Sequence, residues 1–116
     1  VGFYTKYGDG GVDLSPIADL NKTEVFEIAA HLEVIQSIQT AAPTDGLWDD
    51  GRTDEDQLGA SYPEMEWAME ALAQKLPEST MNSRQKEVLN IYQEHHRKNK
   101  HKMNPIPVCM IPKSLY

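Results

Sequence analysis

Residues that could bind an anionic ligand stand near the start of the chain, around a glycine-rich turn. Lys6 and Asp13 flank a stretch with three glycines at positions 8, 10 and 11, and Asp9 lies inside it. A lysine can neutralise a phosphate as a point charge, and a carboxylate can accept hydrogen bonds from ribose hydroxyls or an amide. Because glycines ease tight turns and close backbone approach, we predict a loop that cradles a ligand; the alternative for each charged residue is surface charge alone.

Lys22 is a second candidate for anion binding, because a helix should begin beside it. Asn21, with Glu24 three residues later, has the pattern of a capping box, in which the two side chains satisfy backbone amides of the first turn. Lys22 would then lie at a helix N-terminus, where the macrodipole disfavours a cation and the free amides attract anions. A lysine in that place indicates a functional role.

The residue types and their spacing give little support for a metal site or a catalytic nucleophile. His95 and His96 are neighbours that would point in different directions on a helix, and the sequence has neither a cysteine pair nor His-Glu-x-x-His. Cys109 stands in an apolar run between prolines, where packing in the core is the expected role. No Gly-x-Ser-x-Gly elbow is present. We therefore predict no metal ligand and no catalytic residue within this sequence.

The charge distribution indicates which classes of partner the protein could bind. The net charge of −7 argues against general nucleic-acid binding. Acids concentrate between Asp45 and Glu70, whereas lysines, arginines and histidines crowd positions 95–102. This basic cluster could hold phosphates of a small ligand or complement the dipole of a helix end. No apolar run approaches the roughly 20 residues that span a bilayer, and the single cysteine cannot form an internal disulfide, so we expect a soluble, cytoplasmic protein without membrane contact.

The elements that must hold these residues are predicted to be helices, since apolar residues recur at helical spacing in three segments. The first helix should run from about Lys22 to Leu32, with one apolar stripe facing the core. That stripe comprises Val25, Ile28, Ala29 and Leu32. A helix capped by Ser61 should end before Pro77, and a last helix capped by Asn82 should end before Pro105.

A long loop is predicted between the first two of these helices. It should run from Thr40 to about Ala60, after a short helical turn at 34–38, because glycines and prolines interrupt regular structure there. Loops of this length are usually functional lids or disordered segments. Trp48 gives this loop a large side chain with which to pack, so we predict a lid.

Four segments in order resemble ammonia-dependent NAD synthetases. The first is the stretch 4–23 around Lys-Tyr-Gly-Asp-Gly-Gly-Val-Asp at 6–13. The second is Ala-Pro-Thr-Asp-Gly-Leu-Trp at 42–48, and the third is Thr-Asp-Glu-Asp-Gln-Leu-Gly at 53–59 with Ser-Tyr at 61–62. The last is His-Lys at 101–102 with Pro-Ile-Pro at 105–107. Together these motifs cover nearly the whole chain.

The resemblance implies an α/β enzyme with a Rossmann-like adenine nucleotide α-hydrolase fold, working as a homodimer. Residues 1–116 would be the C-terminal part of a single NAD synthetase domain, mainly helical with one long loop, and the apolar residues Val1–Tyr4 look like the end of a strand. Such enzymes adenylate the nicotinate carboxylate of deamido-NAD with ATP and magnesium, and ammonia then displaces AMP to give NAD. Cations must offset the triphosphate charge, and the lid must keep water from the mixed anhydride.

The resemblance also implies roles for particular residues, none of which must act as a general base. Deamido-NAD would contact Lys6, Asp13, His101 and Lys102, and ATP would contact Lys22 and Thr44. The Ser-Gly-Gly-x-Asp-Ser pyrophosphate loop of these enzymes, and their magnesium-binding Glu, would precede Val1. We therefore expect the magnesium ligands outside this segment and no activity from the segment alone.

Two other interpretations stay open at the level of sequence. The chain could belong to the synthetase domain of a glutamine-dependent relative, which an amidase domain upstream would reveal. It could also be a non-catalytic helical interaction module with an acidic loop and a basic tail, which would bind no nucleotide.

Overall fold

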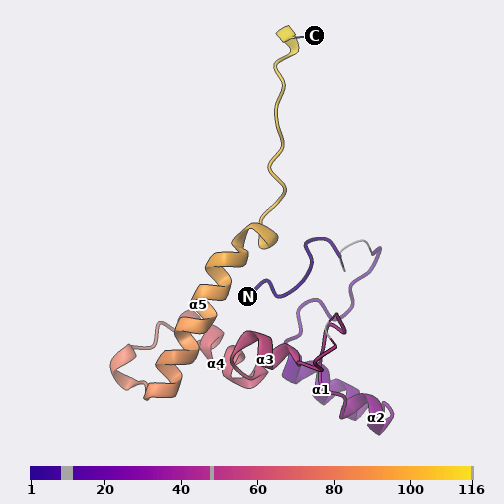
Figure 1. Ribbon diagram of the computed structural model, residues 1–116, viewed down its shortest axis with the longest axis vertical. Coiled ribbons are helices and arrows are strands. Elements are labelled where there is room, and N and C mark those ends of the chain that lie inside the picture. The colour runs from indigo at the N-terminus through magenta and orange to yellow at the C-terminus, as the bar shows by residue number, and fades with distance from the viewer. Residues whose placement is uncertain (9–11, 48, 116) are drawn as a thin grey trace.

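A computed structural model describes residues 1–8, 12–47 and 49–115 (Figure 1). Within these ranges the regular structure is helical, and no strand is formed. The α-helices are α1 (Lys22–His31), α2 (Gln36–Gln39), α3 (Asp54–Leu58), α4 (Tyr62–Ala73) and α5 (Ser83–Met103), with 3-10 turns η1 (Glu78–Thr80) and η2 (Lys113–Leu115). The prediction of a mainly helical segment is confirmed. None of the helices in these ranges has both the length and the hydropathy needed to cross a membrane.

Capping boxes begin four of the helices. The boxes of α1, α4 and α5 are those predicted, with Asn21, Ser61 and Asn82 as the capping residues. A fourth begins α3, where Thr53 accepts from the amide of Asp56 and the Asp56 carboxylate accepts from the amide of Thr53. The expected loop from Thr40 to Ala60 is therefore wrong in its second half, because this box supplies the first-turn amides with acceptors.

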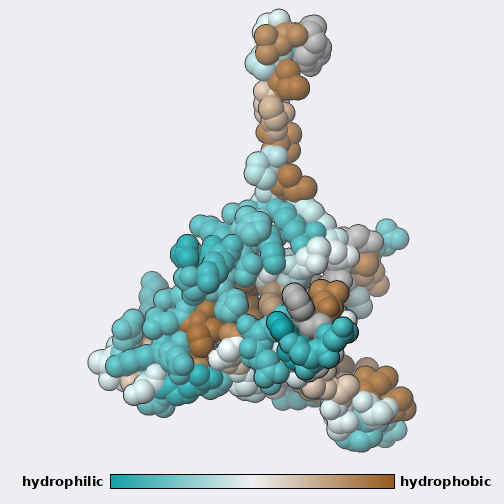
Figure 2. Space-filling model, viewed as in Figure 1, coloured by the Kyte–Doolittle hydropathy of each residue, from teal (hydrophilic) through white to brown (hydrophobic). Residues whose placement is uncertain are grey.

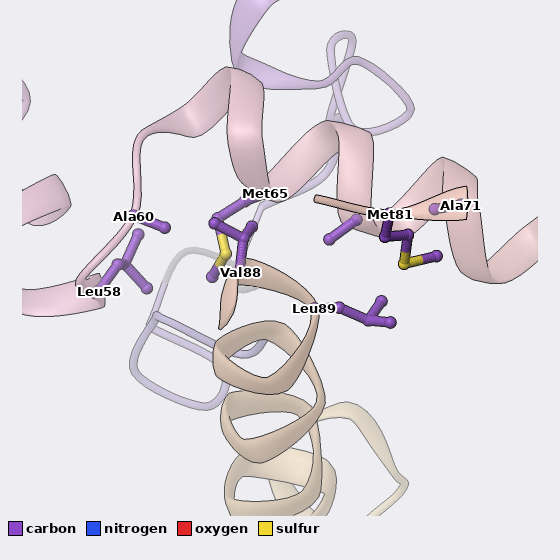
Figure 3. Packing of buried hydrophobic residues seen from close by; sticks show 8 residues of the cluster. Leu58, Ala60, Met65, Ala71, Met81, Val88 and Leu89 are labelled. Carbon is purple, nitrogen blue, oxygen red and sulfur yellow. The ribbon is translucent and has the colours of Figure 1, made fainter. Parts of the chain in front are cut away.

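The hydrophobic core lies where α4 packs against α5 (Figure 3). Its buried members are Leu58, Ala60, Met65, Ala68, Ala71, Met81, Val88 and Leu89. Ala68 is fully buried and Val88 is only 1% exposed, so small side chains on α4 let α5 approach closely. The core thus joins the end of α3 to α4 and α5.

The first helix lies outside this core. α1 packs on α2 and on α4, yet it contains no buried residue, and Ile28 and Leu32 of its apolar stripe are exposed. The expectation that the whole stripe faces the core is wrong. Of the stripe, only Val25 and Ala29 are half-buried, because the contacts of α1 with α2 and α4 leave Ile28 and Leu32 uncovered.

The first residues run beside α5 without forming the expected strand. The Nδ2 atom of Asn99 donates to the carbonyl of Val1 at 3.1 Å, and Phe3 packs against the core. A Cβ at Gly2, whose φ is 70°, would lie 2.5 Å from the Cβ of Asn99, so glycine permits this approach. A strand requires a neighbouring strand for its hydrogen bonds, and the described residues offer a helix instead.

The residues after α5 extend away from the helices (Figure 1). Pro105 and Pro107 follow the end of α5, in agreement with the predicted stop. Val108 and Met110 are exposed on this tail, which is largely apolar in Figure 2. Cys109 is also exposed, so the prediction that it packs in the core is wrong: the prolines direct it away from α4 and α5.

Candidate functional site

Lys6, which is expected to bind deamido-NAD, contacts the C-terminal end of α5, where the candidates His101 and Lys102 also lie. The ammonium group of Lys6 donates to the carbonyl of His101 at 2.6 Å and to that of Asn104 at 2.5 Å. The ammonium group of Lys102 donates to the carbonyl of Gly2 at 3.2 Å. Because the last carbonyls of a helix lack partners within it, a lysine is a suitable cap there. The contacts bring the start of the chain to its basic cluster.

The geometry leaves Lys6 one donor for a ligand. An ammonium group has three N–H donors, and the carbonyls of His101 and Asn104 take two of them. Lys6 also lies 5.4 Å from the centre of the Tyr7 ring. Its position is therefore fixed by protein contacts before any ligand arrives, while its charge and one donor remain available to a phosphate.

The middle of the predicted cradle is only partly visible. Asp9, Gly10 and Gly11, and the lid residue Trp48, lie outside the described residues. Asp13 is exposed, and no contact within the described ranges joins it to Lys6, His101 or Lys102. Its role in ligand binding remains a prediction.

Lys22 lies at the start of α1, as predicted, and its ammonium group sits over an aromatic ring. The Nζ atom is 5.2 Å from the centre of the Tyr62 ring at the start of α4. Lys22 and Tyr62 both line a groove of about 620 Å³ that also includes Gly2, Tyr4 and Leu20. The groove offers a half-buried cation beside the N-terminus of a helix, an arrangement that suits an anionic group.

Thr44 stands at the base of the acidic loop, where its hydroxyl is already bonded. The hydroxyl donates to the carbonyl of Arg52 at 3.1 Å and accepts from the amide of Gly46 at 3.2 Å. The amide of Asp54 donates to the carbonyl of Pro43 at 2.9 Å. These bonds close the two ends of the loop onto each other, so it projects from a fixed base.

The structure brings the neighbourhoods of Lys22 and Thr44 together. Thr23, which follows Lys22, and Pro43, which precedes Thr44, line one groove of about 450 Å³. The segments that carry Lys22 and Thr44 therefore border one groove, although no contact between their side chains is found in the described ranges. That the two residues bind ATP remains a prediction.

Tyr62 and the acids around it are functional candidates that sequence reasoning missed. The Tyr62 hydroxyl donates to the carboxylate of Asp54 at 2.8 Å, and its amide donates to the carboxylate of Glu55 at 2.7 Å. Burial and then the bond to Asp54 raise the pKa of Tyr62, so it stays a neutral donor. The Ser-Tyr motif was visible, but these partners come from another helix and could not be read from spacing.

The histidines of α5 have structural partners. The Nε2 atom of His95 lies 3.2 Å from the carbonyl of Leu58, whereas His96 stacks on Tyr92 with ring centres 6.3 Å apart. They point to different neighbours, as predicted. In the part of the chain that the structure describes, no group of three or more His, Cys, Asp or Glu side chains could hold a metal ion. The described residues therefore do not fit a magnesium site.

Comparisons with known proteins agree on one family. The family model described as NAD synthase matches residues 1–106. The NH(3)-dependent NAD(+) synthetase of Thermoplasma acidophilum is 41% identical over 104 residues, which are 90% of this chain and 41% of that protein. The protein of the same name from Methanosarcina mazei is 39% identical over 111 residues, 93% of this chain and 43% of that protein. That from Methanococcoides burtonii is 58% identical over 62 residues, 53% of this chain and 23% of that protein.

The chain matches only part of the length of each of these relatives. The chain spans about two fifths of the Thermoplasma and Methanosarcina proteins and less of the Methanococcoides protein. The matched residues 1–106 include every residue to which we assign a binding role, from Lys6 to Lys102.

Proposed function

Because the chain belongs to the NAD synthase family, we propose that it contributes the later part of an ammonia-dependent NAD synthetase and binds deamido-NAD and ATP. In the reaction, a carboxylate oxygen of deamido-NAD attacks the α-phosphorus of ATP and pyrophosphate leaves. Ammonia then attacks the acyl carbon and AMP leaves, which gives NAD. The observation that carries the proposal is that Lys6 caps the end of α5, the helix on which His101 and Lys102 lie.

Deamido-NAD is the ligand that we assign to the C-terminal end of α5. Its pyrophosphate is anionic, and the ammonium groups of Lys6 and Lys102 would offset that charge. Lys6 is held by two carbonyls and keeps one donor, so it can bind a phosphate oxygen without leaving its cap. Asp13 would accept from a ribose hydroxyl or an amide, and His101 would contact the same ligand.

ATP is the ligand that we assign to Lys22 and Thr44. Lys22 would place its charge on the polyphosphate at the N-terminus of α1, where the helix dipole adds to the attraction. Thr44 would contact ATP from the fixed base of the acidic loop. Closure of the loop would keep water from the acyl-adenylate, a mixed anhydride that water would hydrolyse.

The remaining features of the enzyme are part of the same proposal. We expect a Rossmann-like sheet and the magnesium ligands to come from parts of the enzyme other than these residues. We also expect a homodimer that works in the cytoplasm, and no NAD formation by the 116-residue chain alone.

A chimeric enzyme tests the proposal. Residues 1–106 would replace the matching segment of the Thermoplasma acidophilum relative, and NAD formation from deamido-NAD, ATP, magnesium and ammonia would be followed. We expect activity. We also expect Lys22→Ala to lower kcat/KM for ATP by an amount that corresponds to a loss of about 1–3 kcal/mol of transition-state stabilisation, the scale of a charged hydrogen bond. Lys86→Ala, an exposed lysine on α5, is the matched control and should change nothing. A folded but inactive chimera would contradict the assignment.

A further inference from the structure

We propose that Tyr62 and Glu66, one turn apart on α4, position Lys22 for the polyphosphate of ATP; this inference rests on the function proposed above. Glu66 fixes the end of α1, and Tyr62 holds the Lys22 side chain. Neither residue needs to touch the nucleotide, so both are positioning residues.

Glu66 acts as a second cap on α1, supplied by another helix. Its Oε1 atom accepts from the amide of Thr23 at 2.9 Å, and its Oε2 atom accepts from the Thr23 hydroxyl at 2.5 Å. Asn21 meanwhile takes the amide of Glu24. A carboxylate is favourable at a helix N-terminus, and two bonds to one residue restrict how α1 can rotate against α4. Because Thr23 follows Lys22 directly, the backbone of Lys22 is fixed as well.

Tyr62 restrains the Lys22 side chain without using its donors. A cation over an aromatic face is attracted by the ring quadrupole, which offsets the unfavourable dipole at this position. Within the described ranges Lys22 makes no hydrogen bond or ion pair, so its ammonium donors stay free for phosphate oxygens. Lysine side chains lose considerable rotamer freedom on binding, and a side chain that is already restrained loses less.

Tyr62 is itself held by α3, which links Lys22 to the acidic loop. Asp54 accepts from the Tyr62 hydroxyl, and Glu55 accepts from its amide. The amide of Asp54 in turn donates to the carbonyl of Pro43 at the base of the loop. The chain of contacts therefore runs from the loop that carries Thr44, through Tyr62, to Lys22, and it joins the two residues assigned to ATP.

The first test is independent of catalysis and uses the full 116-residue chain. In NMR spectra the ε-methylene protons of Lys22 should show a ring-current shift that Tyr62→Phe keeps and Tyr62→Leu removes. Glu66→Ala should accelerate hydrogen exchange at the Thr23 amide, whereas Glu70→Ala, one turn further along α4, should not. A Lys22 resonance that does not respond to Tyr62→Leu would overturn the proposal.

The second test measures the consequence in the chimeric enzyme. Tyr62→Leu and Glu66→Ala should each raise KM for ATP by about two- to tenfold, the range for ordering one rotamer-rich side chain. The value of kcat and the KM for deamido-NAD should not change, and Tyr62→Phe should stay close to the parent enzyme. In a Lys22→Ala background neither substitution should add a further loss, because both act through Lys22.

The outcomes separate this inference from the function on which it rests. If Lys22→Ala weakens ATP use but Tyr62→Leu and Glu66→Ala do not, the positioning role is wrong and the proposed function stands. Equal increases in KM for both substrates would also overturn the positioning role, since they would show a general loss of structure. If Lys22→Ala itself changes nothing, the ATP assignment fails.

Discussion

Glu64 is expected to stabilise the packing of α4 against α5 in a pH-dependent way. Its carboxylate accepts from Nε of Arg84 at 2.8 Å, from Nη2 of Arg84 at 2.9 Å and from the amide of Ser61 at 2.9 Å. The bonds from Arg84, and then that from Ser61, lower the pKa of Glu64 from its usual 4.5 to about 2. Because the pKa is lower in the folded protein, the stabilisation is complete above pH 4.5 and is lost as the pH falls towards about 2.

The perturbation that tests this is Glu64→Gln, which removes the charge and keeps a residue suited to the N3 position of a capping box. At face value the lowered pKa corresponds to roughly 3 kcal/mol of unfolding free energy. The side chain is 33% exposed, however, and solvent screens such pairs. We therefore expect a loss of about 1 kcal/mol at pH 7.

Urea unfolding of the full chain at pH 7 and pH 2.5 measures the effect as the difference between the parent and Glu64→Gln. Taking this difference cancels the contribution of the other carboxylates, which both proteins share. The difference should be smaller at pH 2.5 than at pH 7. Glu87→Gln is the control, since Glu87 also bonds to Arg84, at 3.0 Å, but is 61% exposed and should cost less. A loss from Glu64→Gln that is equal at both pH values would refute the reasoning.

Three further outcomes are expected. Gly59→Ala should destabilise the chain by about 1–2 kcal/mol in urea unfolding, because φ is 79° there and Ile91 leaves room for the methyl group, so the cost comes from the backbone. Val88→Ala should cost about 2 kcal/mol by the same measurement, since the side chain is 1% exposed in the core. Hydrogen exchange in the chimeric enzyme should be fast at 45–47 and slow at 57–59, and only the former should become protected when ATP and deamido-NAD bind; equal protection without ligands would contradict a lid.

The parts of the fold that depend on neighbouring residues could be predicted from the sequence. The boxes at Asn21, Ser61 and Asn82 each join residues three positions apart, so their pattern is visible in the chain. The box at Thr53 was equally local and was missed, because the nearby glycines and the run of acids favoured a loop and its N3 residue is aspartate. The stripe of α1 was misjudged for another reason: what covers a helix face is decided by distant segments.

In the candidate site, too, local patterns could be predicted from the sequence and contacts between distant segments could not. The motifs predict that Lys6, His101 and Lys102 bind one ligand, but not that Lys6 caps the helix that carries His101, a contact across 95 positions. The bond between Thr23 and Glu66 spans 43 positions and was likewise invisible. Residue type and motif order can indicate which side chains act, whereas the residues that position them depend on packing between helices.

The two lysines to which we assign ligands are held by different contacts, and this has a consequence for their substitution. Lys6 is fixed by two hydrogen bonds to the end of α5, so removing its ammonium group takes away a helix cap together with the proposed ligand contact. Lys22 is fixed by the ring of Tyr62 and keeps its donors, so its removal leaves the ends of the helices satisfied. Loss of Lys6 should therefore lower both stability and affinity for deamido-NAD, whereas loss of Lys22 should lower ATP use alone. The ammonium group of Lys6 thus takes part in hydrogen bonds that hold the fold, whereas that of Lys22 keeps its donors free.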